Sequence, residues 1–101
     1  MAKLMRAVEE HLEDTNFGPT QLCQAMGMSR SHLHLKIKAL TNRSTSIFIR
    51  TIRLHKAKEL LQKGELNVTQ IAFEVGFNDL SYFSRTFTEE FGMNPQNVVP
   101  S

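Results

Sequence analysis

The chain has 101 residues, of which 41% are apolar, and this is enough for one domain, or for two tightly coupled subdomains, with a modest core. No apolar run approaches the ~18–20 residues that cross a bilayer, and acidic residues stand where a secretory signal would be apolar, so we expect a cytoplasmic protein without membrane contact. The formal net charge is only +2, and the single cysteine, Cys23, cannot form an internal disulfide and is expected in the core.

The first part of the chain predicts four helices with recognisable ends. They are expected over residues ~3–14, ~19–26, ~30–41 and 44–63. Gly18 before Pro19 is typical of a helix start, and Gly27 is typical of the end of the same helix. Ser29 is expected to cap the third helix, and Ser44 is expected to begin the long fourth one.

The second part predicts three shorter helices, over residues ~68–75, over residues ~80–91 and in a last turn that starts at residues 94–95. Asn67 followed by Gln70 resembles a capping box, and Gly76 is expected to end that helix. Asp79 is expected to cap the next helix and Gly92 to end it. No segment alternates convincingly at period two, so the chain is expected to be all-α with seven helices.

Positive charge is concentrated in the third and fourth predicted helices. Eight basic residues and no acid lie between residues 30 and 58. By contrast, residues 1–29 carry two basic and four acidic residues, and residues 64–101 carry one basic and five acidic residues. A cationic segment favours phosphate groups, but basic runs are more often solvated helix faces, so this pattern alone is weak evidence for a nucleic-acid partner.

A pattern of apolar residues and glycine occurs twice. The segment "LCQAMGM" at residues 22–28 matches "IAFEVGF" at residues 71–77, at an offset of 49. Beyond the turn the offset is 50, with matches of Leu33 to Phe83, Ile37 to Phe87 and Asn42 to Gly92. Each copy has the outline of a helix-turn-helix. Helical hairpins with glycine turns are common, so a single copy is weakly specific for DNA binding.

The second helix of each copy has a calculable outer face, because successive residues are ~100° apart. The residues expected to face inward in the first copy are Leu33, Ile37 and Leu40. Those expected to face outward are Ser31, His34, Leu35 and Lys38. The corresponding outward residues in the second copy are Ser81, Ser84, Arg85 and Thr88. Short polar residues let a helix enter the major groove, and arginine to guanine is the commonest specific contact, so both faces fit DNA reading, the second better.

The long helix suggests why two copies are present. A helix over residues 44–63 is ~30 Å long, and successive major-groove faces on one side of a duplex are ~34–36 Å apart. A rigid helix of this length would hold two reading helices one DNA turn apart. One chain would then place two recognition helices in successive major grooves, as a dimer of single helix-turn-helix units does.

Four blocks of the sequence resemble the DNA-binding domain of AraC/XylS-type transcription regulators. They are "IRLHKAKELL" at 52–61, "IAFEVGF" at 71–77, "SYFSRTF" at 81–87 and "FGMNP" at 91–95. The spacing of the blocks is highly specific, and the resemblance covers nearly the whole chain, from about residue 4 to residue 95. The first half, with "MSRSHLHLKIKALT" followed by "SIFIRTIRL", is most similar to C-terminal output domains of hybrid two-component sensor-regulators.

The resemblance implies two helix-turn-helix subdomains, residues 1–43 and 64–101, built as homeodomain-like three-helix units and joined by a linker helix at 44–63. It implies double-stranded DNA as the partner, RNA polymerase as a further candidate partner, no cofactor, and a place as the C-terminal part of a larger sensor-regulator. The base-facing residues that it implies are Arg30, Ser31, His34, Leu35, Leu80, Ser81 and Arg85. The residues that it implies for phosphate contact are Lys38, Arg43 and Arg53.

Three departures from the family's usual pattern keep a second interpretation open. Leu35 stands where the family usually has arginine, Thr88 where it usually has lysine, and Val98 and Val99 where an aromatic-basic pair usually follows "NP". Leu35 leaves base hydrogen bonding by the first subdomain open. Thr88, Val98 and Val99, together with the acidic C-terminal part, favour weak phosphate contact by the second subdomain. The alternative function is a helical protein-interaction module that has kept the fold and lost DNA binding.

Other chemistries have little support in the sequence. His32 and His34 face different ways on one helix, without a Cys, Asp or Glu at metal-ligand spacing, so no metal site is expected. No Ser/His/Asp constellation and no phosphate-binding glycine loop is visible, and we find no case for an enzyme. The phenylalanines at 73, 77, 83, 87 and 91 fit a core better than a stacking platform for single strands.

Overall fold

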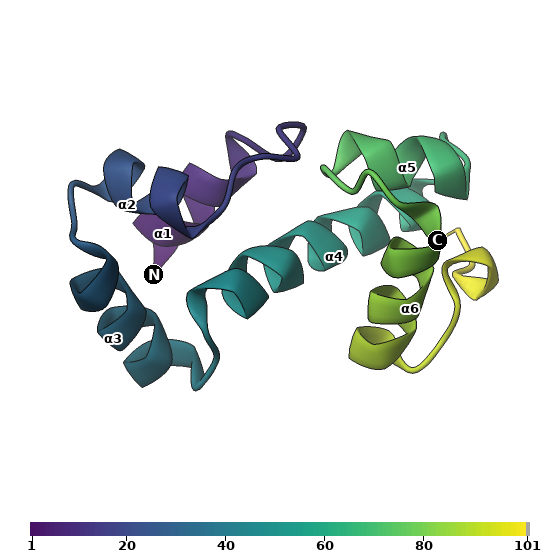
Figure 1. The fold of residues 1–101 in the computed structure, drawn as a ribbon. Coiled ribbons are helices and arrows are strands. Elements are labelled where there is room, and N and C mark those ends of the chain that lie inside the picture. Colours follow the sequence, from purple (N-terminus) through teal and green to yellow (C-terminus); the bar gives the residue numbers. More distant parts are fainter. Residues whose placement is uncertain (101) are drawn as a thin grey trace. The chain divides into compact units, whose positions relative to one another are not determined.

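The computed structural model describes residues 1–100, which form six α-helices and one short 3-10 turn (Figure 1). The elements are α1 (Ala2–Glu9), α2 (Pro19–Met26), α3 (Arg30–Thr41), α4 (Thr45–Lys63), α5 (Val68–Glu74), α6 (Leu80–Phe91) and the turn η1 (Pro95–Asn97). These residues contain no strand, so the all-α class is confirmed. None of these helices combines the length and the apolarity that a membrane span requires.

The expected count of seven helices is corrected to six. The segment after Asn94 makes a single 3-10 turn of three residues, in which the N–H of Asn97 donates to the Asn94 carbonyl at 2.9 Å. Pro95, at the start of this turn, has no N–H to donate, and 3-10 geometry is rarely extended beyond one turn. Within the described residues, the segment after α6 therefore forms no further α-helix.

The first helix is also shorter than expected. α1 ends at Glu9, and the N–H groups of His11 and Asp14 make turn-type bonds to carbonyls three residues back. The acidic residues after Glu9 stand at the negative end of the helix dipole, which disfavours further helix. Asp14 then accepts the N–H of Asn16 on Oδ1 at 2.9 Å, and this local bond competes with helical hydrogen bonding.

The described chain divides into two compact units, one from Met1 to Ile52 and one that begins at Arg53. The boundary lies inside α4. The sequence-based division assigns the whole segment 44–63 to a linker, whereas in the structure the two halves of α4 contribute to separate cores. Each unit is therefore described by its own core.

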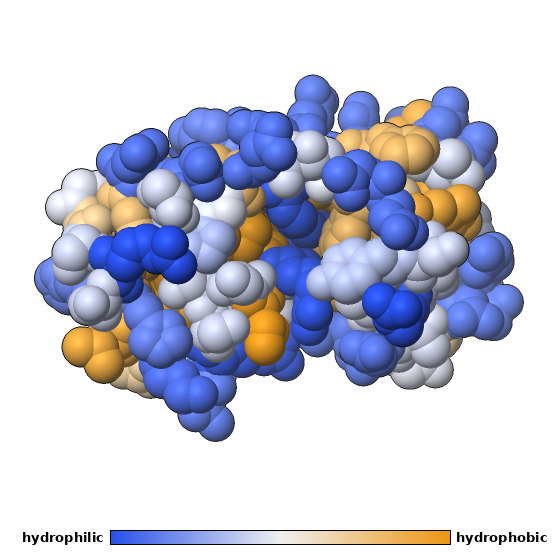
Figure 2. Space-filling model, viewed as in Figure 1, coloured by the Kyte–Doolittle hydropathy of each residue, from blue (hydrophilic) through white to orange (hydrophobic). Residues whose placement is uncertain are grey.

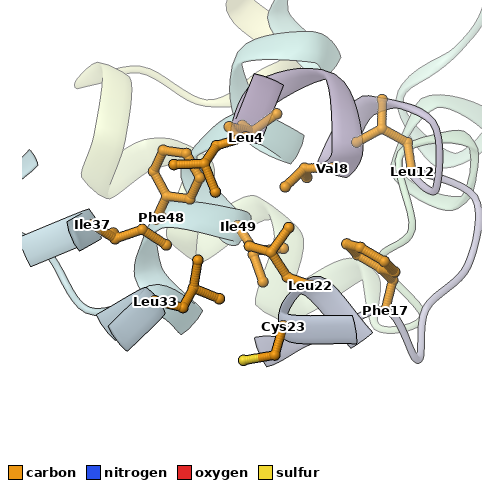
Figure 3. Packing of buried hydrophobic residues seen from close by; sticks show 11 residues of the cluster. Leu4, Val8, Leu12, Phe17, Leu22, Cys23, Leu33, Ile37, Phe48 and Ile49 are labelled. Atoms are coloured by element: carbon orange, nitrogen blue, oxygen red, sulfur yellow. The ribbon is translucent and has the colours of Figure 1, made fainter. Parts of the chain in front are cut away.

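The core of the first unit is formed by α1, α2, α3, the start of α4 and the segment between α1 and α2 (Figure 3). Its buried members are Leu4, Val8, Leu12, Phe17, Leu22, Cys23, Leu33, Ile37, Phe48, Ile49 and Ile52. Cys23 lies in this core, as its apolar-periodic position predicts. Burial of each large aliphatic side chain stabilises the unit by ~1.5–3 kcal/mol relative to exposure.

The core of the second unit is formed by the end of α4 with α5 and α6. Its buried members are Leu54, Ala57, Leu61, Ile71, Ala72, Val75, Phe77, Phe83 and Phe87. The Phe83 ring lies 5.1 Å from that of Phe77 and 5.7 Å from that of Phe87, centroid to centroid, in tilted arrangements that aromatic pairs prefer. The expected core position of Phe73 is wrong, since this side chain is 52% exposed. Ile71 and Ala72 of α5, with Val75 directly after it, supply the buried positions of this segment, and Phe73 is not among them.

The sequence repeat is confirmed by the hydrogen bonds of the two turns. After α2, Gly27 adopts φ +66°, and the next N–H donates to the Cys23 carbonyl at 3.0 Å. After α5, Gly76 adopts φ +94°, and the next N–H donates to the Ala72 carbonyl at 2.9 Å. This bonding satisfies carbonyls that a helix end leaves open, and it needs the left-handed backbone that glycine adopts without strain.

The second helix of each copy begins and ends in the same way. Ser29 Oγ and Asp79 Oδ1 each accept the N–H three residues further on, at 3.2 Å and 3.0 Å. The left-handed residue at the end is Asn42 after α3 and Gly92 after α6. Ser29, Asp79 and Gly92 thus act as the caps that the sequence predicts, and Asn42 is a further cap that it did not.

Candidate nucleic-acid interface

One side of α3 is buried and the opposite side is exposed. Leu33 and Ile37 are buried, as expected. The exposed residues from the predicted site are Arg30, Ser31, His34, Leu35 and Lys38. The expected inward position of Leu40 is wrong, because its side chain is 51% exposed. The inner stripe continues from Ile37 to Thr41, whose hydroxyl donates to the Ile37 carbonyl at 2.8 Å, and this leaves Leu40 on the flank of the helix.

Leu35 is the most exposed of the large apolar side chains in α3, at 67%. Its neighbours on the outward side, Ser31 and Lys38, are also exposed. A leucine at this position has no donor or acceptor for a base edge. It can contact an apolar group, such as the thymine methyl in the major groove.

Arg30 is the first residue of α3, and its side chain connects this helix to α2. Its Nη1 donates to Thr20 Oγ1 at 3.2 Å. Thr20 lies in the first turn of α2, where backbone N–H groups lack partners inside the helix. The second copy has Thr69 at the place of Thr20 but Leu80 at the place of Arg30, so this contact has no counterpart there.

The two other basic residues assigned to the first subdomain lie near the junction of α3 and α4. Lys38 is exposed, and its Nζ lies 3.4 Å from the Asn42 carbonyl at the end of α3. Arg43 is half-buried, and its Nη1 donates to Thr51 Oγ1 at 2.7 Å. Both cations belong to the first unit, and their phosphate contacts stay predictions.

Arg53 is placed differently from the other basic residues. Its side chain is only 6% exposed, and Nη1 donates to the Val75 carbonyl at 2.7 Å. Val75 follows the last residue of α5, where carbonyls have no partner inside the helix. A charged donor to a buried carbonyl is a strong hydrogen bond, which gives Arg53 a structural role in the second unit. Its implied phosphate contact stays a prediction of the family resemblance.

In α6 the predicted residues also separate into a buried and an exposed side. Phe83 and Phe87 are fully buried. Leu80, Ser81 and Arg85, the three residues assigned to bases, are all exposed. All three residues that the family resemblance assigns to bases in the second copy are therefore exposed on α6.

Thr88, expected on the same outward side, is half-buried. Its hydroxyl lies 2.8 Å from the Ser84 carbonyl and 2.9 Å from Asn94 Oδ1. This side chain therefore ties the turn after α6 to the helix. It occupies the position at which the family usually has a lysine, and it supplies no positive charge there.

Among the contacts that the sequence did not predict, two involve residues assigned to bases. One is the bond of Thr20 to Arg30. The other is the contact of Arg85 with Tyr82, in which the guanidinium carbon lies 5.5 Å from the centre of the ring. The spacing of three residues between Tyr82 and Arg85 is a sequence signal for neighbours on a helix, and it could have indicated the second contact.

Exposed positive charge is distributed unequally between the two recognition candidates. Of the eight basic residues between 30 and 58, three are exposed, all in α3: Arg30, Lys36 and Lys38. In α6 the only basic residue is Arg85. On the face drawn in Figure 2, hydrophilic side chains predominate and apolar ones form small separate groups. The first copy thus carries more of the charge that attracts phosphate, and the second carries the side chain best suited to guanine.

The histidines offer no cluster for metal binding. Within residues 1–100, no group of three or more His, Cys, Asp and Glu side chains is arranged to hold a metal ion. His32 and His34 are both exposed on α3. His55 lies 3.2 Å from Glu90, as Nε2 to Oε2, and its ring contacts Phe91 edge-on at 4.9 Å, which ties α4 to α6 within the second unit.

Comparison with known proteins relates this chain to helix-turn-helix domains. The family model described as a helix-turn-helix domain matches residues 22–99. Histidine kinase P4 of Formosa agariphila is 37% identical over 95 residues, which are 94% of this chain and 7% of that protein. The transcriptional activator RhrA of Rhizobium meliloti is 36% identical over 103 residues, which are 97% of this chain and 32% of that protein.

A solved structure matches over nearly its whole length. It is the C-terminal domain of the two-component response regulator yesN from Fusobacterium nucleatum, with a TM-score of 0.81, 27% identity, and coverage of 94% of this chain and 92% of that one. The chain spans 7% and 32% of the two curated relatives above. It therefore corresponds to one part of each of these longer proteins.

Proposed function

This chain belongs to the AraC-type helix-turn-helix family of DNA-binding transcription regulators, and from that premise we propose that it binds specific sites in double-stranded DNA through α3 and α6. The observation that carries the proposal is the repeated motif, in which each second helix is buried on one side and exposed on the other. Each exposed side has a serine at the second helical position, Ser31 or Ser81. Such a short side chain lets the helix backbone approach base edges.

We further propose that the two recognition helices occupy successive major grooves. The support is the length of α4, whose 19 residues give ~28 Å, against ~34–36 Å between successive groove faces. In this arrangement Arg85 reads a guanine, Leu35 contacts a thymine methyl, and the exposed lysines of α3 contact phosphates.

Selection of bound sites from random duplex DNA tests the proposal. We expect a motif in two parts whose centres are ~10–10.5 base pairs apart. Arg85→Ala should relax the preference for guanine at one position of one part, at a cost of ~1–3 kcal/mol on the selected site. Lys63→Ala, which removes an exposed charge outside both recognition helices, is the matched control and should leave the motif unchanged.

A protein-interaction module is the second candidate function, and the high exposure of Leu35 is the observation that favours it. An exposed apolar side chain at the centre of a helix face suits a protein surface as well as a thymine methyl. Selection of bound sites at low salt distinguishes the two functions, because only a DNA-reading protein enriches a sequence motif. Failure to enrich any sequence there would contradict DNA reading and favour the interaction module.

We also propose that the chain acts as the output part of a larger sensor-regulator. The support is its match to a small share of a histidine kinase and to nearly all of a response-regulator C-terminal domain. RNA polymerase is then a candidate partner of the DNA-bound form. Transcription in vitro from a promoter that carries the selected site, with and without the protein, measures whether bound protein changes polymerase activity.

A further inference from the structure

Arg85, the proposed guanine reader, lies against the ring of a neighbouring tyrosine. The guanidinium carbon is 5.5 Å from the ring centre of Tyr82, within the ~6 Å at which a cation is attracted to an aromatic face. The two residues are three apart on α6, so they are neighbours on the helix surface. Arg85 is also the only basic residue after Lys63, so no other cation of that part of the chain can take its place.

Tyr82 is itself held in place by the second unit. Its ring contacts the buried ring of Phe77, with centroids 6.0 Å apart and planes inclined by 46°. Its N–H donates to Asp79 Oδ1 at 3.0 Å, and its carbonyl accepts from the Thr86 hydroxyl at 2.9 Å. The backbone and the ring of Tyr82 are therefore both tied to the helix start and to the core.

A fixed ring beside an exposed arginine changes the binding of that arginine to DNA. An exposed arginine samples many rotamers and loses this freedom when it binds, so a contact that restricts it beforehand lowers the cost of binding. A guanidinium that packs on a ring keeps its N–H donors available at its edge, and these are the groups that bind guanine in a bidentate manner.

The first copy of the motif lacks this pair. At the offset of 50, His32 stands at the place of Tyr82 and Leu35 at the place of Arg85. At the offset of 49, Met28 stands at the place of Phe77. The cation, the ring beside it and the core ring behind it are all replaced. An arginine that packs on a tyrosine ring is therefore found in the second copy and not in the first.

We propose that Tyr82 is a positioning residue that holds Arg85 ready for a base. This inference rests on the proposed function, since it assumes that Arg85 reads DNA. It assigns Tyr82 an effect on the choice of base that is separate from general DNA affinity.

The test measures affinity for the selected site and for three duplexes that differ only at the base pair affected by Arg85→Ala. Tyr82→Ala should lower the preference for the selected base about two- to fivefold, the range expected from an exposed cation–π contact. Tyr82→Phe keeps the ring and should retain the preference. His32→Ala, at the matching place of the first copy, should leave the preference at this base pair unchanged.

A second measurement, on the protein without DNA, tests the contact of Arg85 with the Tyr82 ring independently of the proposed function. In NMR spectra, the ring current of residue 82 should shift the Arg85 side-chain protons in the original chain and in Tyr82→Phe, and this shift should be lost in Tyr82→Ala. If the shift is present but Arg85→Ala keeps the base preference, then reading by Arg85 is wrong and the positioning role is overturned with it.

Other results overturn the inference alone. One is an equal loss of affinity for all four duplexes in Tyr82→Ala. Another is the same loss in Tyr82→Phe as in Tyr82→Ala, which would show that the hydroxyl acts and the ring does not. In the Arg85→Ala background, Tyr82→Ala should have no further effect on preference, because the side chain that it positions is absent.

Discussion

Leu35 illustrates how one side chain changes what a recognition helix can read. It is 67% exposed, in the place that the family usually gives to arginine. It cannot hydrogen-bond a base, but it can pack on a thymine methyl, so we expect A·T preference at the position that it faces. The affinity of α3 would then come chiefly from exposed cations such as Arg30 and Lys38.

Leu35→Arg should therefore tighten binding to DNA in general and shift one selected position towards guanine. The buried side, with Leu33 and Ile37, is untouched, so the fold should persist. Leu40→Arg is the matched control, because it adds the same charge to an exposed leucine on the flank of α3 and should raise affinity without changing the motif. Site selection and titration with the three proteins provide the comparison. Identical motifs and equal affinities for Leu35→Arg and the original chain would show that α3 does not face the bases.

Arg53 is a buried cation of the second unit, although the family resemblance implies that it contacts phosphate. Removal of its side chain leaves the Val75 carbonyl without the donor that lies 2.7 Å away. We expect Arg53→Ala to lower the free energy of unfolding by about 2–3 kcal/mol, the size of a buried hydrogen bond to a charged group. Binding to all DNA sequences should weaken alike, because less of the second unit is folded.

Urea denaturation followed by circular dichroism measures this change. Lys36→Ala removes the same charge from an exposed position and should alter stability by no more than ~0.5 kcal/mol. If Arg53→Ala keeps its stability but loses DNA affinity with a smaller salt dependence, Arg53 acts on phosphate, as the family resemblance implies.

At the scale of elements, the two recognition helices end on left-handed residues of different type. Asn42 has φ +59° and Gly92 has φ +73°. Asparagine is among the few residues with a side chain that adopt this conformation readily. Asn42 in the first copy thus predicts that asparagine is tolerated at the position of Gly92 in the second copy.

Gly92→Ala should destabilise the protein by about 1 kcal/mol, because alanine is strained at positive φ. A Cβ at this position meets no atom within 4 Å, so the cost arises from the backbone and not from a clash. Gly92→Asn should cost less than Gly92→Ala. Chemical denaturation of the two variants gives the difference, and equal stabilities would indicate that the left-handed conformation is not required.

At the scale of the whole molecule, the distribution of exposed charge determines the response to salt. Of the eight basic residues between 30 and 58, Arg53 is buried, Lys56 lies 3.3 Å from Glu59, and Lys58 lies over the Phe91 ring. The exposed ones are the three in α3. The phosphate contacts should therefore be fewer than the count of basic residues suggests.

We expect affinity for DNA to fall about 40- to 150-fold between 50 and 200 mM salt, as three to four phosphate contacts predict. Titration with the selected duplex over this range gives the slope of log affinity against log salt. Six contacts would give a loss above ~10³-fold. A slope near zero would exclude the electrostatic contribution of α3.

Local features of this protein could be predicted from the sequence because they depend on neighbours within a few residues. One example is the capping box at the start of α5. There Asn67 Oδ1 accepts the Gln70 N–H at 2.8 Å, and Gln70 Oε1 accepts the Asn67 N–H at 3.0 Å. Another is the left-handed turn at Gly27. The repeat, six of the seven expected helices and the exposed positions of Leu35 and Arg85 follow from the same short-range rules of helix periodicity and capping.

Features that depend on segments far apart in the chain were decided by tertiary structure alone. Arg53 is buried, and its Nη1 donates to the carbonyl of Val75, a residue 22 positions further along the chain. Leu40 and Phe73 have apolar side chains suited to a core, yet they are exposed because the inner stripes of their helices take other positions. Helix periodicity indicates which residues share a side, but the elements packed against a helix determine how wide its buried stripe is and which charges stay in water.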